Sequence, residues 1–324
     1  MRLGALFATL ILFFTCTAYA ELTSEQQQAK AHGLMLYNQF KAISAKPFLE
    51  IAAEAGDRES QFFLAEALVK KGRYMTAEAY KWYEAAANQG DLYSMLRLSR
   101  TDNDLCSIMN NCPSSTKTPL DWLKQARAIA GVNAEKGDAE AMYVMYLATA
   151  ELEWLEKSAE AGYAQGQWLL ANRYQEGEGF FFLPGNRKES YEKWIKASAE
   201  GGNPKAMMAY VGILYKKGDM ETARHWITKA AETGFESGVT SLGAYSGHAP
   251  AKFGFPLDVV KGYGLISLLR ELDGGGNVQV YVDEVLPEIA AKMTPEQIEQ
   301  AKVFAKEWKA THPPLSFFPD KLGY

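Results

Sequence analysis

The chain has 324 residues, of which 34 are Lys or Arg and 39 are Asp or Glu, so its formal net charge at pH 7 is -5. This mild acidity, without runs of Lys or Arg, gives no electrostatic basis for binding nucleic acid or an anionic membrane surface. The length is sufficient for a large hydrophobic core or for an extended array of repeats.

The N-terminus has the composition of a secretory signal peptide. Met1-Arg2 carries a positive charge, residues 3–14 are almost wholly apolar, and Ala18-Tyr19-Ala20 has the small-x-small pattern of a signal-peptidase site. The apolar run is too short to span a bilayer comfortably, which disfavours a membrane anchor. Cys16 leaves a lipoprotein as the alternative, although bulky Phe13-Phe14 before it is unusual in a lipidation signal. We therefore expect cleavage of residues 1–20 and a periplasmic mature chain.

The mature chain divides into three predicted parts. Residues 21–46 are expected to form an N-terminal capping helix, which runs from Ser24 to Ala45 and begins with a capping box of Ser24 and Gln27. Residues 47–273 are expected to form a repeat solenoid. Residues 274–324 are expected to form C-terminal capping helices and a tail, because the ends of a stack need a polar outer face.

A short pattern occurs six times within the solenoid region: an alanine, a glycine three residues later, and a small residue four positions after the glycine. The glycines are Gly56, Gly90, Gly137, Gly162, Gly202 and Gly234. The alanines are Ala53, Ala87, Ala134, Ala159, Ala199 and Ala231, and the small residues are Ser60, Ser94, Ala141, Gly166, Ala206 and Gly238. Eight positions before the glycines stand Phe48, Trp82, Ile129, Trp154, Trp194 and Trp226. A repeated unit of this length is typical of a solenoid.

The repeated residues predict how one helix ends and the next begins. A glycine just past a helix end adopts the left-handed backbone without a steric penalty. The residue after it is Asp57, Asp91, Asp138 or Asn203 in four units, and each is a good N-cap for the following helix. The alanine and the small residue would let consecutive helices approach closely. The aromatic residue is expected to begin the inward face of the preceding helix and to pack in the core.

The longest interval between glycines contains Cys106 and Cys112. In an exported protein this pair predicts one disulfide that closes a small loop, and two free thiols are the less favoured alternative. Such a loop would present Ile108 and Met109 at its tip, so both are candidate partner-binding residues.

Phe180, Phe181 and Phe182 interrupt the repeat after the turn at Gly177 and Gly179. Three consecutive phenylalanines cannot all face one helical stripe, and exposed aromatic side chains are good interface anchors. The alternative is that they fold back over neighbouring helices.

The C-terminal region is expected to be mostly helical. One helix is predicted near Leu257 to Leu272, and the segment from Val278 to Val282 could be helix or strand because its valines alternate. A strong helix start at Thr294-Pro295, with Gln297 as the partner of the capping box, predicts a helix to about Thr311. The tail beyond it carries Phe317 and Phe318, and it either docks along the solenoid or serves as a partner-binding arm.

One unit resembles a known family. Tyr174, Gly177, Gly179, Lys188, Tyr191, Trp194, Ala197, Ala199 and Gly202 follow the order of the Sel-one-like repeat, a relative of the tetratricopeptide repeat. The resemblance covers roughly Phe48 to Leu272, and the helix that ends in Trp308 is similar to the closing helix of many bacterial members. It implies an all-α fold, an α-solenoid of stacked antiparallel helix pairs in a right-handed superhelix, with a concave surface that binds other proteins.

The resemblance also implies a function. Members are adaptors rather than enzymes, and some neutralise secreted lipase toxins in the periplasm. We therefore expect an immunity protein that occludes the active site of a type VI, phospholipase-type toxin. The alternative is a general cell-envelope scaffold in secretion or cell-wall assembly.

No residue pattern in the sequence indicates a catalytic, metal or cofactor site. The chain has 4 histidines, His32, His225, His248 and His312, and none has the spacing of a helical metal site. The Gly-x-Ser-x-Gly motif is absent, and the Gly-x-Gly turn lacks the preceding strand of a dinucleotide-binding loop. We expect no enzymatic activity, no cofactor, no nucleic-acid partner and no stable membrane insertion.

Overall fold

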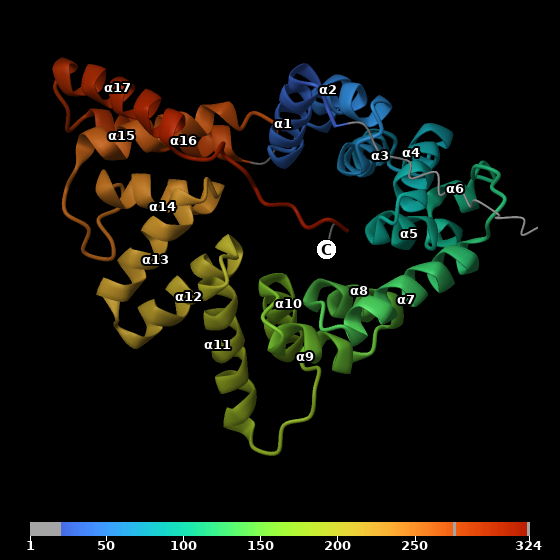
Figure 1. Cartoon of the computed structure of the whole chain (residues 1–324). Helices are drawn as coiled ribbons and strands as arrows, with labels where there is room; N and C mark the ends of the chain where they lie inside the picture. The colour runs from blue at the N-terminus through green and yellow to red at the C-terminus, as the bar shows by residue number, and fades with distance from the viewer. Residues whose placement is uncertain (1–20, 275–276, 323–324) are drawn as a thin grey trace, which may run out of the picture.

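The computed structural model describes residues 21–274 and 277–322, so the predicted signal peptide lies outside the described residues. These residues form an all-α protein (Figure 1). The first helices are α1 (Ser24–Asn38), α2 (Ala42–Glu54), α3 (Arg58–Gly72), α4 (Ala77–Asn88), α5 (Leu92–Leu98), η1 (Thr101–Asn103), α6 (Leu105–Ile108), α7 (Pro119–Glu135), α8 (Ala139–Thr149) and α9 (Leu152–Glu160). They are followed by α10 (Ala164–Glu176), α11 (Pro184–Glu200), α12 (Pro204–Lys217), α13 (Met220–Glu232), α14 (Glu236–Ser246), α15 (Val259–Leu268), η2 (Leu269–Glu271), α16 (Val278–Ala290) and α17 (Pro295–Thr311).

Consecutive helices pack against each other along the chain, so the predicted all-α solenoid of stacked helix pairs is confirmed. The six repeat glycines all have positive φ, at 93° for Gly56, 87° for Gly90, 91° for Gly137, 91° for Gly162, 93° for Gly202 and 78° for Gly234. In four of the six units, a side-chain oxygen of the next residue caps the following helix. The clearest example is Asp138, whose carboxylate accepts a hydrogen bond from the Ala141 backbone N at 3.0 Å. One glycine and one polar residue therefore end one helix and begin the next.

The residue after the recurring aromatic is fully buried in five of the repeats, a position that the sequence did not single out. Leu49, Tyr83, Leu155, Ile195 and Ile227 are all 0% exposed. By contrast, Trp82 is 8% and Trp194 is 9% exposed, while the other aromatic residues of this position are only half-buried. Trp82 and Trp194 thus pack in the core as expected, whereas Trp154 and Trp226 are partly buried and pack against it.

The N-terminal capping region differs from its prediction. The capping box consists of Thr23 and Gln26, one residue earlier than expected, and α1 ends at Asn38 rather than at Ala45. The chain turns here because Phe40 adopts a left-handed backbone with φ of 60°, after which α2 begins. The expected domain boundary at residue 46 therefore lies inside α2.

The C-terminal helices follow the sequence more closely. The segment from Val278 is helical, so the possible strand does not form. The predicted capping box of Thr294 and Gln297 begins α17, which ends at Thr311. The predicted helix from Leu257 to Leu272 is shorter, with α15 continued by the 3-10 helix η2.

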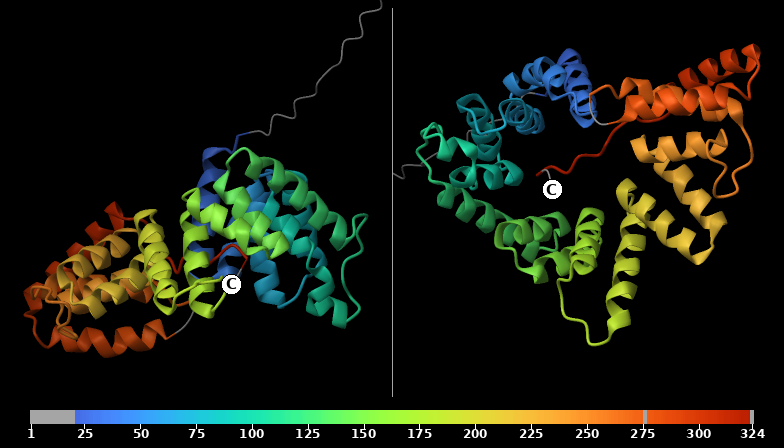
Figure 2. Two further views of the ribbon diagram at one scale, coloured as in Figure 1. Left: turned by 90° about the horizontal axis from the view of Figure 1, so that it is seen from below. Right: turned by 180° about the vertical axis from the view of Figure 1, so that it is seen from behind.

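The stack of helices curves into a ring whose last helices lie beside the first (Figures 1 and 2). The Lys41 ammonium lies 2.6 Å from the Asp273 carboxylate and joins the α1–α2 turn to the segment after η2. The two ends also touch closely, because a Cβ on Gly274 would lie 2.6 Å from the carbonyl oxygen of Gln39. The ring encloses a concave inner face, on which the candidate site lies.

The close helix contact at the small position can be tested at two glycines. A Cβ on Gly238 would lie 2.5 Å from the backbone carbon of Ala230, whereas a Cβ on exposed Gly212 would meet no atom within 4 Å. We expect Gly238→Ala to lower the free energy of unfolding by about 1–3 kcal/mol through overpacking. Gly212→Ala should raise it by about 0.5–1 kcal/mol, since alanine favours the helix interior. Urea unfolding measures both changes, and an equal effect of the two substitutions would contradict the close contact at Gly238.

Candidate protein-binding surface on the concave face

A cavity of about 440 Å³ lies on the inner face of the ring. Aromatic side chains of three helices line it, namely Phe63 from α3, Tyr93 from α5 and Tyr143 from α8. The polar residues at the beginnings of α10 and α12 complete the lining, with Gln165 and Lys205 among them. The concave face therefore combines aromatic surface with polar and charged side chains that suit a polypeptide of complementary charge.

The C-terminal tail of the chain crosses the opening of the ring and occupies part of this face (Figures 1 and 2). The Ser316 N–H donates to the Gly234 carbonyl, and the Glu236 N–H donates to the Ser316 carbonyl, both at 2.9 Å. The Phe317 N–H donates to the carbonyl of Asn38 at 3.0 Å. Residues 315–317 thus bind both the end of α1 and the turn between α13 and α14.

The two tail phenylalanines pack within the molecule. The ring of Phe317 stacks on Phe40 with a centroid distance of 4.5 Å, and Phe318 meets the edge of Phe235 at 5.8 Å. Of the two sequence-based alternatives for the tail, the structure has the docked arrangement. Phe317 and Phe318 are therefore contacts of the ring with its own tail in this state.

The end of the tail is held by charged side chains. The Asp320 carboxylate accepts a hydrogen bond from Gln165 Nε2 at 3.0 Å and pairs with Lys205 Nζ at 3.0 Å. The Lys321 ammonium lies 3.7 Å from the Glu140 carboxylate and 4.5 Å from the centroid of the Tyr93 ring. These two residues of the tail have opposite charges, and each faces a group of complementary charge.

Burial raises the pKa values of two tyrosines near Glu140. The Tyr93 hydroxyl donates to Glu140 Oε1 at 2.8 Å, and burial, followed by its neighbours Tyr163 and Glu140, raises the pKa of Tyr93. Burial and the charge of Glu140 also raise the pKa of Tyr163 to about 12. Both phenols therefore remain neutral hydrogen-bond donors at physiological pH, and Glu140 remains the acceptor that faces Lys321.

A second charged group lies between α3, α4 and α5. Glu66 is 3% exposed, and its carboxylate accepts hydrogen bonds from Arg97 Nη2 at 2.9 Å and from the Tyr83 hydroxyl at 2.7 Å. Burial alone would lower the pKa of Arg97, but the charge of Glu66, the neighbouring Tyr83 and the hydrogen bond to Glu66 together outweigh it and raise the pKa. A buried carboxylate with this many donors is satisfied, which indicates a role in joining three helices rather than in catalysis.

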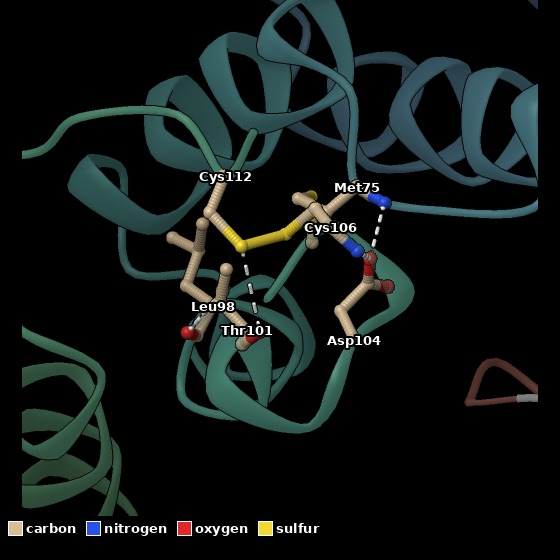
Figure 3. Close-up of a disulfide and its surroundings, with 6 residues drawn as sticks. All are labelled: Met75, Leu98, Thr101, Asp104, Cys106 and Cys112. Atoms are coloured by element: carbon tan, nitrogen blue, oxygen red, sulfur yellow. Dashed lines mark hydrogen bonds between the residues drawn. A yellow bond between two sulfur atoms is a disulfide. The ribbon is translucent and has the colours of Figure 1, made fainter. Parts of the chain in front are cut away.

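The disulfide predicted between Cys106 and Cys112 is present (Figure 3). The Asp104 carboxylate accepts hydrogen bonds from the backbone N of Cys106 at 2.9 Å and of Met75 at 2.8 Å, which ties the loop to the turn between α3 and α4. Ile108 is 78% exposed and Met109 is 49% exposed. The disulfide loop thus displays two apolar side chains on a fixed base.

The three phenylalanines between α10 and α11 divide into two kinds. Phe180 is 86% and Phe182 is 88% exposed, whereas Phe181 is half-buried. The ring of Phe181 meets Tyr174 edge-on at 4.9 Å, and the Arg187 guanidinium lies 4.7 Å from its centroid. Phe180 and Phe182 are thus exposed, as the first sequence-based alternative expected. Phe181 folds back against the neighbouring helices, as the second expected.

The candidate residues from the sequence do not form one surface. The disulfide loop and the α10–α11 turn lie at different corners of the ring, and the tail lies inside it (Figure 1). The groups that bind the end of the tail, Gln165, Lys205, Glu140 and Tyr93, were not predicted. The alternation of charge at Asp320-Lys321 was a signal in the sequence, but the Gln165 partner of Asp320 is 155 residues away and only the folded ring joins them.

No group of three or more His, Cys, Asp or Glu residues is placed to hold a metal ion in residues 21–274 and 277–322. Within the same ranges, no helix has both the length and the apolar character needed to cross a bilayer.

Three solved structures are similar to the chain. A protective antigen of uropathogenic Escherichia coli strains displaying an SLR fold is 20% identical, with a TM-score of 0.48, over 89% of this chain and 62% of that one. A Sel1 repeat protein from Oxalobacter formigenes is 19% identical, with a TM-score of 0.40, over 75% of this chain and 99% of that one. An assembly chaperone of RpL4 is 13% identical, with a TM-score of 0.28, over 88% of this chain and 99% of that one.

The chain is similar to Sel1-type repeat proteins. This agrees with the resemblance seen in the sequence. The chain spans less than two thirds of the length of the first of these structures, and at these identities and TM-scores the likeness concerns the fold alone. No protein-family model matches the chain, and no curated protein matches it either.

Substitutions in the α10–α11 turn should separate packing from exposed surface. Phe181→Ala removes the ring that lies between Tyr174 and Arg187, so we expect a loss of about 1–2 kcal/mol in the free energy of unfolding. The double variant Phe180→Ser and Phe182→Ser should change it by less than about 0.5 kcal/mol, because both rings face solvent. Thermal unfolding measures the two variants side by side. A larger loss in the double variant would show that the exposed rings contribute to the fold.

Proposed function

We propose that this protein binds another protein in the periplasm and that it is an immunity protein, which inhibits a secreted phospholipase-type toxin by occluding its active site. The observation that supports protein binding most directly is the occupied concave face. An extended polypeptide lies on it, held by main-chain hydrogen bonds and by complementary charges. A surface that binds one extended chain in this way has the chemistry to bind another.

The periplasmic location rests on two features of the chain. The N-terminal twenty residues have the composition of a cleavable export signal. The Cys106–Cys112 disulfide is of a kind that persists in oxidising compartments and is rare in the cytosol.

The ring offers what an inhibitor needs. A tight inhibitor presents a rigid surface with a few apolar anchors, so that little conformational freedom is lost on binding. Phe180 and Phe182 are anchors of this kind, since both are almost fully exposed at one corner of the ring. Ile108 and Met109 form a second exposed group on the disulfide loop. No catalytic arrangement is needed for this function, and we propose none.

The alternative function is a general cell-envelope scaffold. The separation of the two exposed apolar groups favours it, because they lie at different corners of the ring and suit two different partners (Figure 1). A scaffold would cause an envelope defect when deleted even if no toxin is present.

Co-expression tests the proposal. The toxin is expressed in the periplasm of a host cell from the effector gene that neighbours this gene, with and without this protein. We expect growth to be restored and the two proteins to elute as one complex from a gel-filtration column. The double variant Phe180→Ser and Phe182→Ser should keep its fold and weaken the complex by about tenfold or more, as the loss of interface anchors does.

Two outcomes decide against parts of this proposal. Absence of both rescue and a complex would refute the immunity function. An envelope defect in a deletion strain that lacks the toxin gene would favour the scaffold instead.

A further inference from the structure

We propose that the concave face contains a specific site for an extended polypeptide that carries an aromatic residue, then Pro, an acidic, a basic and an aliphatic residue. Residues 318–322 of the chain itself, Phe-Pro-Asp-Lys-Leu, occupy this site until a segment of a partner protein with the same chemistry replaces them. This inference rests on the proposed function in one respect, namely that the natural occupant belongs to a protein partner.

The tail has two parts that are bound in different ways. Within the described part of the chain, residues 315–317 make all the backbone hydrogen bonds of the tail to the ring, by Gln39 Nε2 to the Leu315 carbonyl at 3.1 Å and by the bonds of Ser316 and Phe317, beside the packing of the Leu315 and Phe317 side chains. Such bonds do not depend on the side chains of the tail. This first part therefore serves as a clamp that joins the beginning and the end of the solenoid.

Residues 320–322, by contrast, contact the groove through their side chains. Asp320 binds Gln165 and Lys205, and Lys321 faces Glu140 and Tyr93. Leu322 is 5% exposed and belongs to the hydrophobic core formed by the first half of the ring. Three consecutive residues thus meet an electropositive, an electronegative and an apolar position in that order.

The groove side of the acidic position is held by a contact that does not involve the tail. Asn203, which is 8% exposed, donates from Nδ2 to Gln165 Oε1 at 3.0 Å. This bond fixes the amide of Gln165 so that its Nε2 faces the carboxylate of Asp320. Lys205 lies in the first turn of α12, two residues after Asn203, and its side chain is 24% exposed. A fixed donor beside a cation is an arrangement that recognises a carboxylate.

Several features make the tail end replaceable. The cavity of about 440 Å³ remains between the tail and the groove, with Phe318, Pro319 and Asp320 on one side of it, so the segment is not closely packed. The side chains of the Asp320–Lys205 ion pair are 18% and 24% exposed, so water and a competing segment can reach both charges. Phe318 also adopts a left-handed backbone with φ of 47°, which is unfavourable for a bulky residue and marks the junction between the clamp and the replaceable end.

A labelled peptide with the sequence of residues 316–324 serves as the probe, and fluorescence polarisation measures its binding to the full chain. The wild-type chain should bind it weakly, because its own tail competes. A full-length variant with Asp320→Ala and Leu322→Asp should release the tail end and bind the natural peptide about tenfold more tightly. Thermal unfolding confirms that the released variant keeps its fold.

A charge exchange then tests the assigned contact. Lys205→Glu in the released variant should abolish binding of the natural peptide and restore binding of a peptide with Asp320→Lys. The matched control is Lys216→Glu, which changes an exposed lysine on the same helix and should leave both affinities unchanged. Failure of the folded, released variant to bind either peptide would overturn the proposal. The tail would then have only a structural role. Equal binding of the natural peptide by the wild-type and released chains would overturn it as well.

Hydrogen exchange provides a test that needs no substitution. An excess of the free peptide should speed amide exchange in residues 318–322 of the wild-type chain, and no change there would contradict displacement. These measurements need no toxin, so they fail or succeed independently of the immunity function. If the toxin is neutralised equally well by the wild-type chain and by Lys205→Glu, the immunity function stands and the groove is not the site that the toxin uses.

Discussion

The close approach of consecutive helices beside each repeat glycine is the constraint on which the rest of this structure depends. The alanine before the glycine and the small residue after it are buried in every unit. In two units the residue directly before the repeat alanine is a serine, whose hydroxyl donates a hydrogen bond to the first turn of the preceding helix. Ser158 donates to the Ala139 carbonyl at 2.7 Å, and Ser198 donates to the Ala164 carbonyl at 2.6 Å. Because these contacts recur with little variation, each helix pair turns relative to the last, and the stack curves until its ends meet.

Closure of the ring gives the C-terminal tail its role. The hydrophobic core has two main parts, one formed by residues 37–213 and the other by residues 211–315, and the tail reaches from the second to the first through Leu315 and Leu322. A segment without regular structure is thereby ordered by contacts with helices from both halves. The same closure places the clamp of residues 315–317 beside the replaceable end on the concave face, so that structural and binding roles share one short segment.

The charges of the inner region divide into two groups by burial. Glu66 is satisfied by Arg97 and Tyr83 and holds three helices together, and a group so well paired has no capacity for a further ligand. Lys205, Gln165 and Glu140 are instead partly open and bind Asp320 and Lys321 of the C-terminal tail. The difference explains why the groove, rather than the buried network, is the part of the ring suited to exchange one polypeptide for another.

The sequence by itself determined the local structure. Periodic glycines, N-caps and small residues defined the helix boundaries within the solenoid, and Cys106 and Cys112 defined the disulfide, because these signals act between residues that are near in the chain. The exception was Phe40, whose left-handed backbone ends α1 early. Only the tertiary structure decided that the ring closes and that Asp320 meets Lys205 and Gln165. Those contacts depend on the summed curvature of all the helix pairs, which no local pattern of residues determines.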